Sequence, residues 1–130
     1  MIEIVDNNSG KTIGNALCYF VYDENDNPAL VVDNIEIKNS NKPSDETGLE
    51  LRNAIAQYAQ NIAKNVTGSD DTKIFMSVNF NDVPCSDLKE TKQTVSFLGD
   101  IDCNKIYMDL YDGIVLRNDL TAQVPLYELT

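Results

Sequence analysis

One continuous stretch decides the fold: ALVVDNIEIK (29–38), NSNKPSDETG (39–48), LELRNAIAQYAQNIAKNV (49–66) and, after a short polar loop, KIFMSVNF (73–80). The first and last runs are rich in β-branched and aromatic residues, which predicts two strands. Apolar residues in the third run recur every three or four positions, which predicts an amphipathic helix. A strand followed by a helix and a second strand indicates parallel neighbours joined by a right-handed crossover.

The ends of the predicted helix carry recognisable signals. Ser44 or Asp45 can cap its first turn, and Thr47 followed by Glu50 also fits a capping box, so the helix is expected to begin near Asp45 to Thr47. Gly68 is expected to end the helix, because glycine readily adopts the left-handed conformation found at helix C-termini.

One face of this helix is predicted to pack on the sheet. Its apolar residues are Leu51, Ile55, Ala59, Ile62 and Val66. These spacings follow a 3.6-residue period, so the five side chains share one side of the helix. Arg52, Gln57, Gln60 and Lys64 lie off that line.

The sequence before the helix predicts three strands in antiparallel succession, over residues 2–6, 13–22 and 29–37. Pro28 marks a strand boundary, because proline cannot donate a hydrogen bond to a neighbouring strand. In the strand after the helix, Ile74, Met76, Val78 and Phe80 are expected to point inward, and alternate residues outward.

The sequence after that strand predicts four further elements. Residues 81–92 are expected to contain a short helix that starts at Pro84 and Ser86. A short strand is expected at 95–99, a hairpin at 105–118 and an edge strand in the tail at 119–130. The predicted fold class is therefore α+β in a single domain of residues 1–130: a mixed, mostly antiparallel sheet with one long crossover helix and a short second helix.

The composition excludes several kinds of chemistry. The 130 residues contain no histidine, which removes histidine-activated nucleophiles and histidine metal sites. Cys18, Cys85 and Cys103 are widely spaced and form no C-x-x-C pair, so neither a metal site nor a disulfide framework is expected. Unpaired cysteines favour a cytoplasmic protein, and no apolar run is long enough to predict a membrane span.

The charge balance bears on partners. Ten basic and 21 acidic side chains give a net charge of −11, which disfavours nucleic-acid binding because such binding relies on Lys and Arg. The acidity can serve solubility alone, or it can attract a basic amine or a Lys-rich protein acceptor. A homodimer is also compatible with the sequence.

The order of elements, with the strand motif Asn34-Ile35-Glu36-Ile37 before the helix, resembles the GNAT family of N-acetyltransferases over roughly residues 1–116. The resemblance implies that acetyl-CoA is the cofactor and lies in a slot formed by the backbone between residues 34 and 48. The residues that this resemblance assigns to cofactor binding are Ile35, Ile37, Lys38, Lys42, Ser44, Gly48 and Asn79.

Three residues are candidates for the chemistry of acetyl transfer to an amine. Asp33 and Glu36, predicted on opposite faces of the strand, could each serve as a base directly or through water. Cys85 lies near the expected position of the cofactor thiol and could donate a proton. Each has a structural alternative: a capping or solvated carboxylate for the two acids, and a packed side chain for the thiol.

The loop before the helix departs from the pattern of the family. NSNKPSDETGLELR has a single glycine and places Asp45 and Glu46 where a pyrophosphate would bind, which opposes binding electrostatically. Three functions therefore stay open. One is an acyl-CoA-binding domain that acetylates a basic acceptor, and another is a non-catalytic GNAT-like interaction module with a degenerate cofactor loop. The third is an acidic decoy that mimics nucleic acid.

Overall fold

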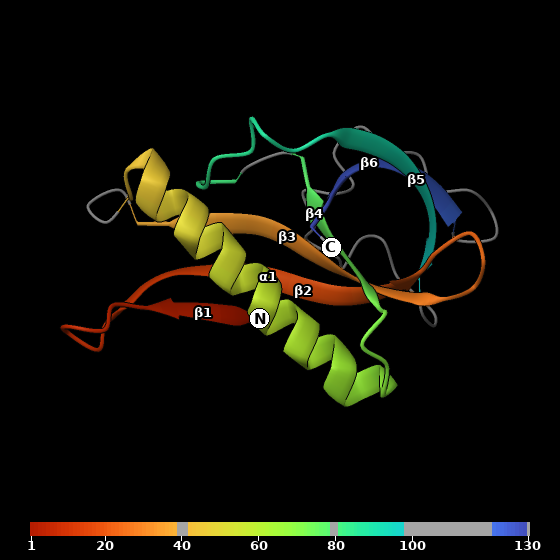
Figure 1. The fold of residues 1–130 in the computed structure, drawn as a ribbon, viewed down its shortest axis with the longest axis horizontal. Coiled ribbons are helices and arrows are strands. Elements are labelled where there is room, and N and C mark those ends of the chain that lie inside the picture. The colour runs from red at the N-terminus through yellow and green to blue at the C-terminus, as the bar shows by residue number, and fades with distance from the viewer. Residues whose placement is uncertain (39–41, 79–80, 98–120, 130) are drawn as a thin grey trace, which may run out of the picture.

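The structure is a computed structural model and describes residues 1–38, 42–78, 81–97 and 121–129. The described chain forms, in order, β1 (Ile2–Val5), β2 (Thr12–Tyr22), β3 (Pro28–Ile37), α1 (Asp45–Thr67), β4 (Lys73–Ser77), β5 (Glu90–Phe97) and β6 (Thr121–Glu128). Six strands form one mostly antiparallel sheet beside a single long helix (Figure 1). The mixed α+β class predicted from the sequence is confirmed.

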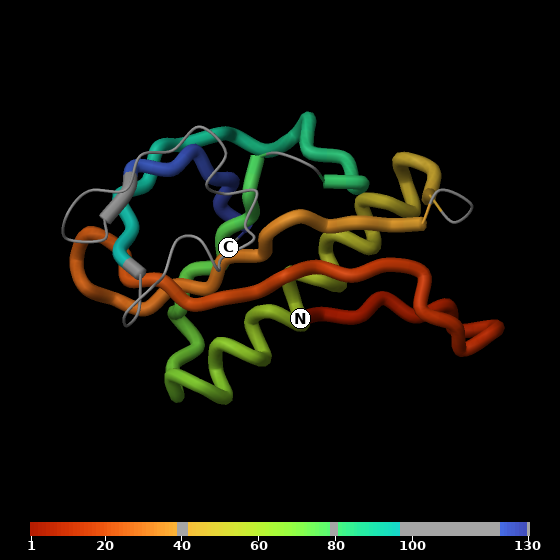
Figure 2. The backbone as a smooth tube through the Cα atoms, turned by 180° about the vertical axis from the view of Figure 1, so that it is seen from behind, coloured from red at the N-terminus to blue at the C-terminus, as the bar shows by residue number. Residues whose placement is uncertain are grey.

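The strands follow the order β1-β2-β3-β4-β6-β5. β3 and β4 are parallel, with Ala29 opposite Lys73 and Val32 opposite Met76, and every other pair is antiparallel. Since α1 connects the parallel strands, the predicted crossover is confirmed. The C-terminal end of β2 also pairs with β5, so the strands from β2 to β6 close into a small barrel, and β1 extends the sheet outside it (Figure 2).

Two apolar clusters lie on opposite faces of β3. The helix-side core includes Ile2, Ile4, Ala16, Leu30, Val32, Ile35, Ile37, Ile55, Ala59, Ala63, Ile74, Met76 and Val83. The barrel core consists of Val21, Ala29, Val31, Phe75, Val95, Val124 and Leu126. β4 is covered on both faces, because Ile74 and Met76 pack toward the helix and Phe75 packs into the barrel. The predicted inward positions of Ile74 and Met76 are thus confirmed, but the outward position of Phe75 is wrong.

The predicted ends of α1 are confirmed. Ser44 is the N-cap, and its side chain accepts the N–H of Thr47. Gly68 is the C-cap, with a left-handed φ of 75°, and its N–H donates to the carbonyl of Lys64 at 2.8 Å. These caps satisfy backbone groups that a helix end would otherwise leave unpaired.

The predicted packing face of α1 is wrong in part, because the helix is rotated. Its buried residues are Gly48, Arg52, Ile55, Ala59 and Ala63. Ile55 and Ala59 are placed as predicted, but Val66 is 65% exposed and Arg52 only 6% exposed. The small residues let the helix backbone approach the sheet closely. Arg52 is held by hydrogen bonds to the loop before β5. These two effects set the orientation of the helix more strongly than the burial of its larger apolar side chains does.

The predicted short second helix is wrong. Residues 81–89 form turns, and residues 90–92, which the prediction also assigned to that helix, belong to β5. The backbone of this segment bonds elsewhere: the N–H of Asp82 donates to the carbonyl of Ile35 on β3, and the N–H of Leu88 closes a turn onto the carbonyl of Cys85. One distant partner and one tight turn thus take up backbone groups that a helix would pair four residues apart.

The C-terminal part of the chain differs from the prediction in position. β6 lies between β4 and β5 instead of at an edge, because Val124 and Leu126 fill the barrel core. Of the predicted strand at 95–99, residues 95–97 form the end of a longer strand, β5, and residues 98–99 lie outside the described residues. The predicted hairpin at 105–118 lies outside the described residues.

Candidate functional site

β3 extends beyond the end of β4, and the predicted cofactor slot lies along this extension. Side chains of the next loop take the place of a neighbouring strand. Asn81 Oδ1 accepts the N–H of Ile35 at 3.1 Å, and Asp82 Oδ2 accepts the N–H of Ile37 at 2.8 Å. The amide group of Asn81 also donates to a β4 carbonyl at 2.6 Å. The backbone donors that the resemblance assigned to the cofactor are therefore hydrogen-bonded within the protein.

Asn34 forms a bulge at the start of this extension. Its φ of 54° is left-handed, and the β2–β3 register shifts here by one residue. Its N–H donates to Ser77 Oγ at 3.2 Å. The extra residue changes the alternation of β3, since both neighbours of Glu36 remain in the helix-side core. Asp33 and Glu36 therefore share the face away from α1, and their predicted placement on opposite faces is wrong.

In the loop before α1, the described residues 42–48 bond and pack within the protein. The carbonyl of Ser44 accepts the N–H of Gly48 at 2.7 Å. A Cβ atom at Gly48 would lie 2.7 Å from Pro84 Cδ, so the glycine permits packing against that ring. The ammonium group of Lys42 lies 3.4 Å from Asp82 Oδ1. These predicted cofactor residues serve the helix cap, the packing of the helix and an ion pair, and together they do not fit a pyrophosphate.

A shallow pocket of about 340 Å³ lies at the outer end of β3. Glu36, Ile37, Lys38 and Asp82 are among its lining residues, so the pocket brings three of the predicted site residues, Glu36, Ile37 and Lys38, together. The backbone N–H of Lys38 is already used, since it donates to the carbonyl of Ile13 at 2.8 Å. The predicted cofactor residue Asn79 lies outside the described residues.

Asp33 is fully buried on β3. Tyr19 donates its hydroxyl hydrogen to Asp33 Oδ2 at 3.0 Å, and Asp33 Oδ1 has no hydrogen-bond partner among the described residues. A base must reach the proton that it removes, and this carboxylate has no exposed surface. Its position suits a structural role beneath the sheet surface.

The other two predicted catalytic groups are also separated. Cys85 packs against the helix-side core, its thiol donates to the carbonyl of Val83 at 3.4 Å, and burial raises the pKa of that thiol. Glu36 is exposed on the opposite face and accepts a hydrogen bond from Asn34 Nδ2 at 3.1 Å. Asp33, Glu36 and Cys85 therefore do not converge on one point, because the sheet lies between the thiol and the two carboxylates.

Arg52 is a key residue that the sequence pattern did not reveal. Its Nη1 donates to the carbonyl of Pro84 at 2.8 Å and to Asp87 Oδ1 at 2.6 Å, and its Nη2 donates to Asp87 Oδ2 at 2.7 Å. The hydrogen bonds from Arg52 lower the pKa of Asp87 from its ordinary 3.8 to about 2. We call these three residues the Arg52 clamp; it holds the loop before β5 against α1.

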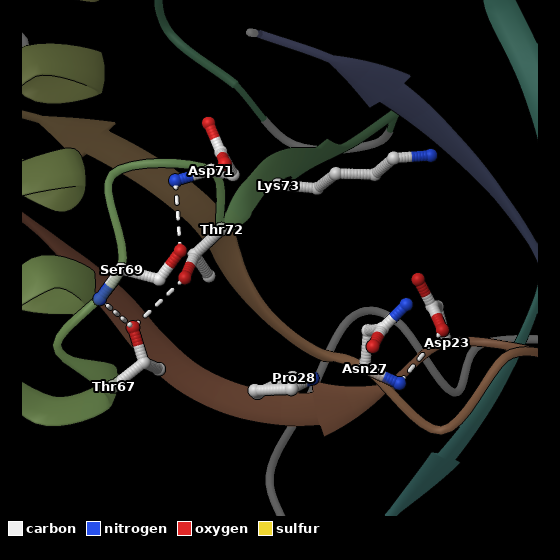
Figure 3. A pocket seen from close by; sticks show the side chains of 8 residues that line it. All are labelled: Asp23, Asn27, Pro28, Thr67, Ser69, Asp71, Thr72 and Lys73. Atoms are coloured by element: carbon white, nitrogen blue, oxygen red, sulfur yellow. Dashed lines mark hydrogen bonds between the residues drawn. The ribbon is translucent and has the colours of Figure 1, made fainter.

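A polar pocket of about 410 Å³ lies at the opposite end of the sheet, where α1 ends and where β3 and β4 begin (Figure 3). Its hydrogen-bonding groups pair mainly with one another. The hydroxyl groups of Thr67 and Thr72 lie 2.9 Å apart, and Ser69 Oγ accepts the N–H of Asp71 at 3.1 Å. No cluster of three potential metal ligands occurs in the described ranges. These hydrogen bonds therefore stabilise the turns that line the pocket.

Comparisons with known proteins add no assignment: no protein family, no curated protein and no solved structure matches the chain. Within the described residues, no helix has the length and apolarity to cross a membrane. The geometry of the described residues is therefore the basis on which a function can be proposed.

Replacing Asn81 by alanine is expected to lower the free energy of unfolding by about 1–3 kcal/mol, because it leaves the buried N–H of Ile35 without its acceptor. Urea unfolding followed by circular dichroism measures the change. Ser86→Ala, in the same loop but exposed, is the matched control and should change stability by less than about 0.5 kcal/mol. Equal stability of Asn81→Ala and the wild type would show that water satisfies this N–H and that the extension is not sealed.

Proposed function

We propose that this chain is a non-catalytic interaction domain. The observation that carries the proposal is the extension of β3, where the N–H groups of residues 34, 35 and 37 are bound by side chains of Ser77, Asn81 and Asp82. A pantetheine arm would have to displace all three side chains, and each displaced partner costs free energy. The Arg52 clamp opposes that displacement, because it fixes the loop that supplies Asn81 and Asp82.

The separation of the candidate catalytic groups also supports this proposal. Acetyl transfer needs a base near the acceptor amine and stabilisation of the leaving thiolate in one site. Here Asp33 is sealed, Glu36 is on the surface and Cys85 lies on the other side of the sheet. A thiol whose pKa burial has raised is also a weak nucleophile at neutral pH.

We propose further that the fold is GNAT-like in its arrangement. Two features support the likeness: one helix crosses over between the only parallel pair in the described sheet, and β3 continues where β4 stops. In this proposal the ancestral cofactor region has been filled by the protein itself. The acidic surface, with a net charge of −11, suits a basic protein partner better than an anionic cofactor.

Titration with acetyl-CoA tests the proposal directly. A ligand at about 100 times its Kd stabilises a protein by about 2.7 kcal/mol, which corresponds to roughly 10 °C in melting temperature for a chain of this size. We expect no shift of the melting temperature up to millimolar acetyl-CoA or free CoA. A saturable rise in melting temperature with both free CoA and acetyl-CoA would refute the proposal. Acyl transfer would then be the better-supported function.

A further inference from the structure

β1 lies at one edge of the sheet that the described strands form. It is the first strand in the sheet order, and β2 is its only neighbour among the described strands (Figure 1). The N–H of Asp6 donates toward β2, to the carbonyl of Lys11 at 2.9 Å. Because backbone groups alternate in direction along a strand, the N–H and C=O groups of Glu3 and Val5 point away from β2. Lysine and proline, which commonly block such edges, are absent from β1.

An apolar groove of about 220 Å³ runs between this edge and the side of α1. Its lining residues are Ile2, Glu3, Ile4, Val5, Leu51, Ala54, Ile55 and Tyr58. We call it the β1–α1 groove. Tyr58 is 55% exposed and Val5 46% exposed, although both are large and apolar enough to favour burial. A strand added to β1 would place every second side chain in this groove, against the flank of α1.

Glu3 indicates which side chains a partner strand would carry on its face away from the β1–α1 groove. Glu3 is the only charged residue that lines the β1–α1 groove, and it is exposed on the face of β1 away from α1. Thr12, on the β2 side, donates its hydroxyl hydrogen to Glu3 Oε1, which leaves Oε2 for a group on the open side. A residue directly opposite Glu3 on an added strand would point to the same face, and a cation is favoured there.

We propose that the β1 edge binds an extended, basic segment of a partner protein by strand addition, with apolar side chains in the β1–α1 groove and a Lys or Arg opposite Glu3. The inference builds on the proposed function, since it names the surface and the partner of the interaction domain. Backbone hydrogen bonds would supply affinity, and the alternating apolar and basic side chains would supply specificity.

A second copy of this chain fits the edge less well. Side chains opposite each other on paired strands share a face, so Glu3 would meet Glu3 or Val5 of the second β1, and neither is a cation. Each copy also carries a net charge of −11, so their approach is repulsive. Charge complementarity therefore favours a basic segment of another protein.

Fluorescence anisotropy with short labelled peptides tests the proposal. The probe is a peptide in which valine alternates with lysine, and its two controls are the same peptide with glutamate for lysine and a peptide of equal composition with the valines and lysines in two blocks. We expect the alternating lysine peptide to bind at least about tenfold more tightly than either control, a difference of about 1.4 kcal/mol. If the block peptide bound as tightly as the alternating lysine peptide, binding would be explained by non-specific charge attraction, and the proposal would be overturned.

Variants of the protein locate the site. Val5→Pro removes an outward N–H at an edge where proline is tolerated, and Tyr58→Asp places a charge in the β1–α1 groove; each is expected to weaken peptide binding about tenfold or more. Val66→Asp is the matched control, because Val66 is exposed on α1 but does not line the groove. Glu3→Lys should reverse the preference, so that the glutamate peptide binds more tightly than the lysine peptide. Unchanged preference in Glu3→Lys would contradict the assigned register.

The oligomeric state of the wild-type protein tests whether a second copy of the chain occupies the β1 edge. We expect a monomer by analytical ultracentrifugation. A dimer that Val5→Pro converts to a monomer would assign the edge to a second copy and overturn the proposal. The test is independent of the acetyl-CoA titration: absence of peptide binding refutes only strand addition, whereas a saturable acetyl-CoA shift refutes the non-catalytic function and leaves the edge result intact.

Discussion

Replacing Phe75 by alanine should lower the free energy of unfolding by about 3–5 kcal/mol, the range typical of buried aromatic truncations. Among the described residues, Phe75 is the largest fully buried side chain, and it is the only contribution of β4 to the barrel core. Five strands surround that core, and the backbone of a closed barrel relaxes poorly around a cavity. For a domain of this size the melting temperature should fall by roughly 10–20 °C.

Two variants control this experiment. Phe75→Leu keeps most of the apolar volume and should cost less than about half as much. Val66→Ala removes apolar atoms from a side chain that is 65% exposed, and should change stability by less than about 0.5 kcal/mol. If Phe75→Ala were as stable as Val66→Ala, the barrel core would not contribute to folding, and the closure of β2 onto β5 would lose its support.

Local signals were sufficient for the helix and for the parallel crossover. Ser44 and Gly68 satisfy the ends of α1 through bonds to residues close in sequence, so their roles were readable from spacing alone. The position of β6 was not readable, because Val124 and Leu126 pack against strands from distant parts of the chain. An apolar alternating tail predicts a strand but not its neighbours.

The rotation of α1 has a similar cause. Val66 has more apolar surface than Gly48 and Ala63, so hydrophobic periodicity wrongly placed it on the packing face, whereas Leu51 and Ile62 are half-buried against the helix-side core as predicted. The observed face instead follows the close approach that small residues permit. Its polar member, Arg52, donates hydrogen bonds to residues more than 30 positions away along the chain, and no local sequence pattern predicts these bonds.

The candidate site shows which features a local sequence pattern can predict and which it cannot. The sequence correctly located a segment of β3 whose backbone donors face beyond β4. Whether a ligand or the protein itself occupies those donors depends on Asn81 and Asp82, 46 and 45 residues from the groups that they bind. Short polar residues in a turn are common, and their usual role in closing the turn gives no hint of such distant bonds.

Replacing Arg52 by methionine is expected to lower the free energy of unfolding by about 1.5–3 kcal/mol at neutral pH, because the variant keeps the packing of the stem but removes a charged donor from the carbonyl of Pro84. The contribution of the Asp87 partner should depend on pH. The folded-state pKa of Asp87 is about 2, below its ordinary 3.8, so its stabilising effect is present above pH 3.8 and is lost as the pH falls toward 2. The stability difference between wild type and Arg52→Met should therefore narrow over that interval.

Urea unfolding at several pH values measures this difference, and carboxyl chemical shifts in NMR report the pKa of Asp87 directly. Asp87→Asn separates the two contributions, because it keeps the Pro84 bond while removing the carboxylate, and its stability difference from wild type should also narrow below pH 3.8. Lys64→Met is the matched control for loss of a cation from the same helix, since Lys64 forms an exposed pair with Asp70 in the following turn and should contribute less than about 1 kcal/mol. An Asp87 pKa that stays near 2 in Arg52→Met would mean that a group other than Arg52 lowers it. The hydrogen bonds between Arg52 and Asp87 would then not be what holds the loop against the extension of β3.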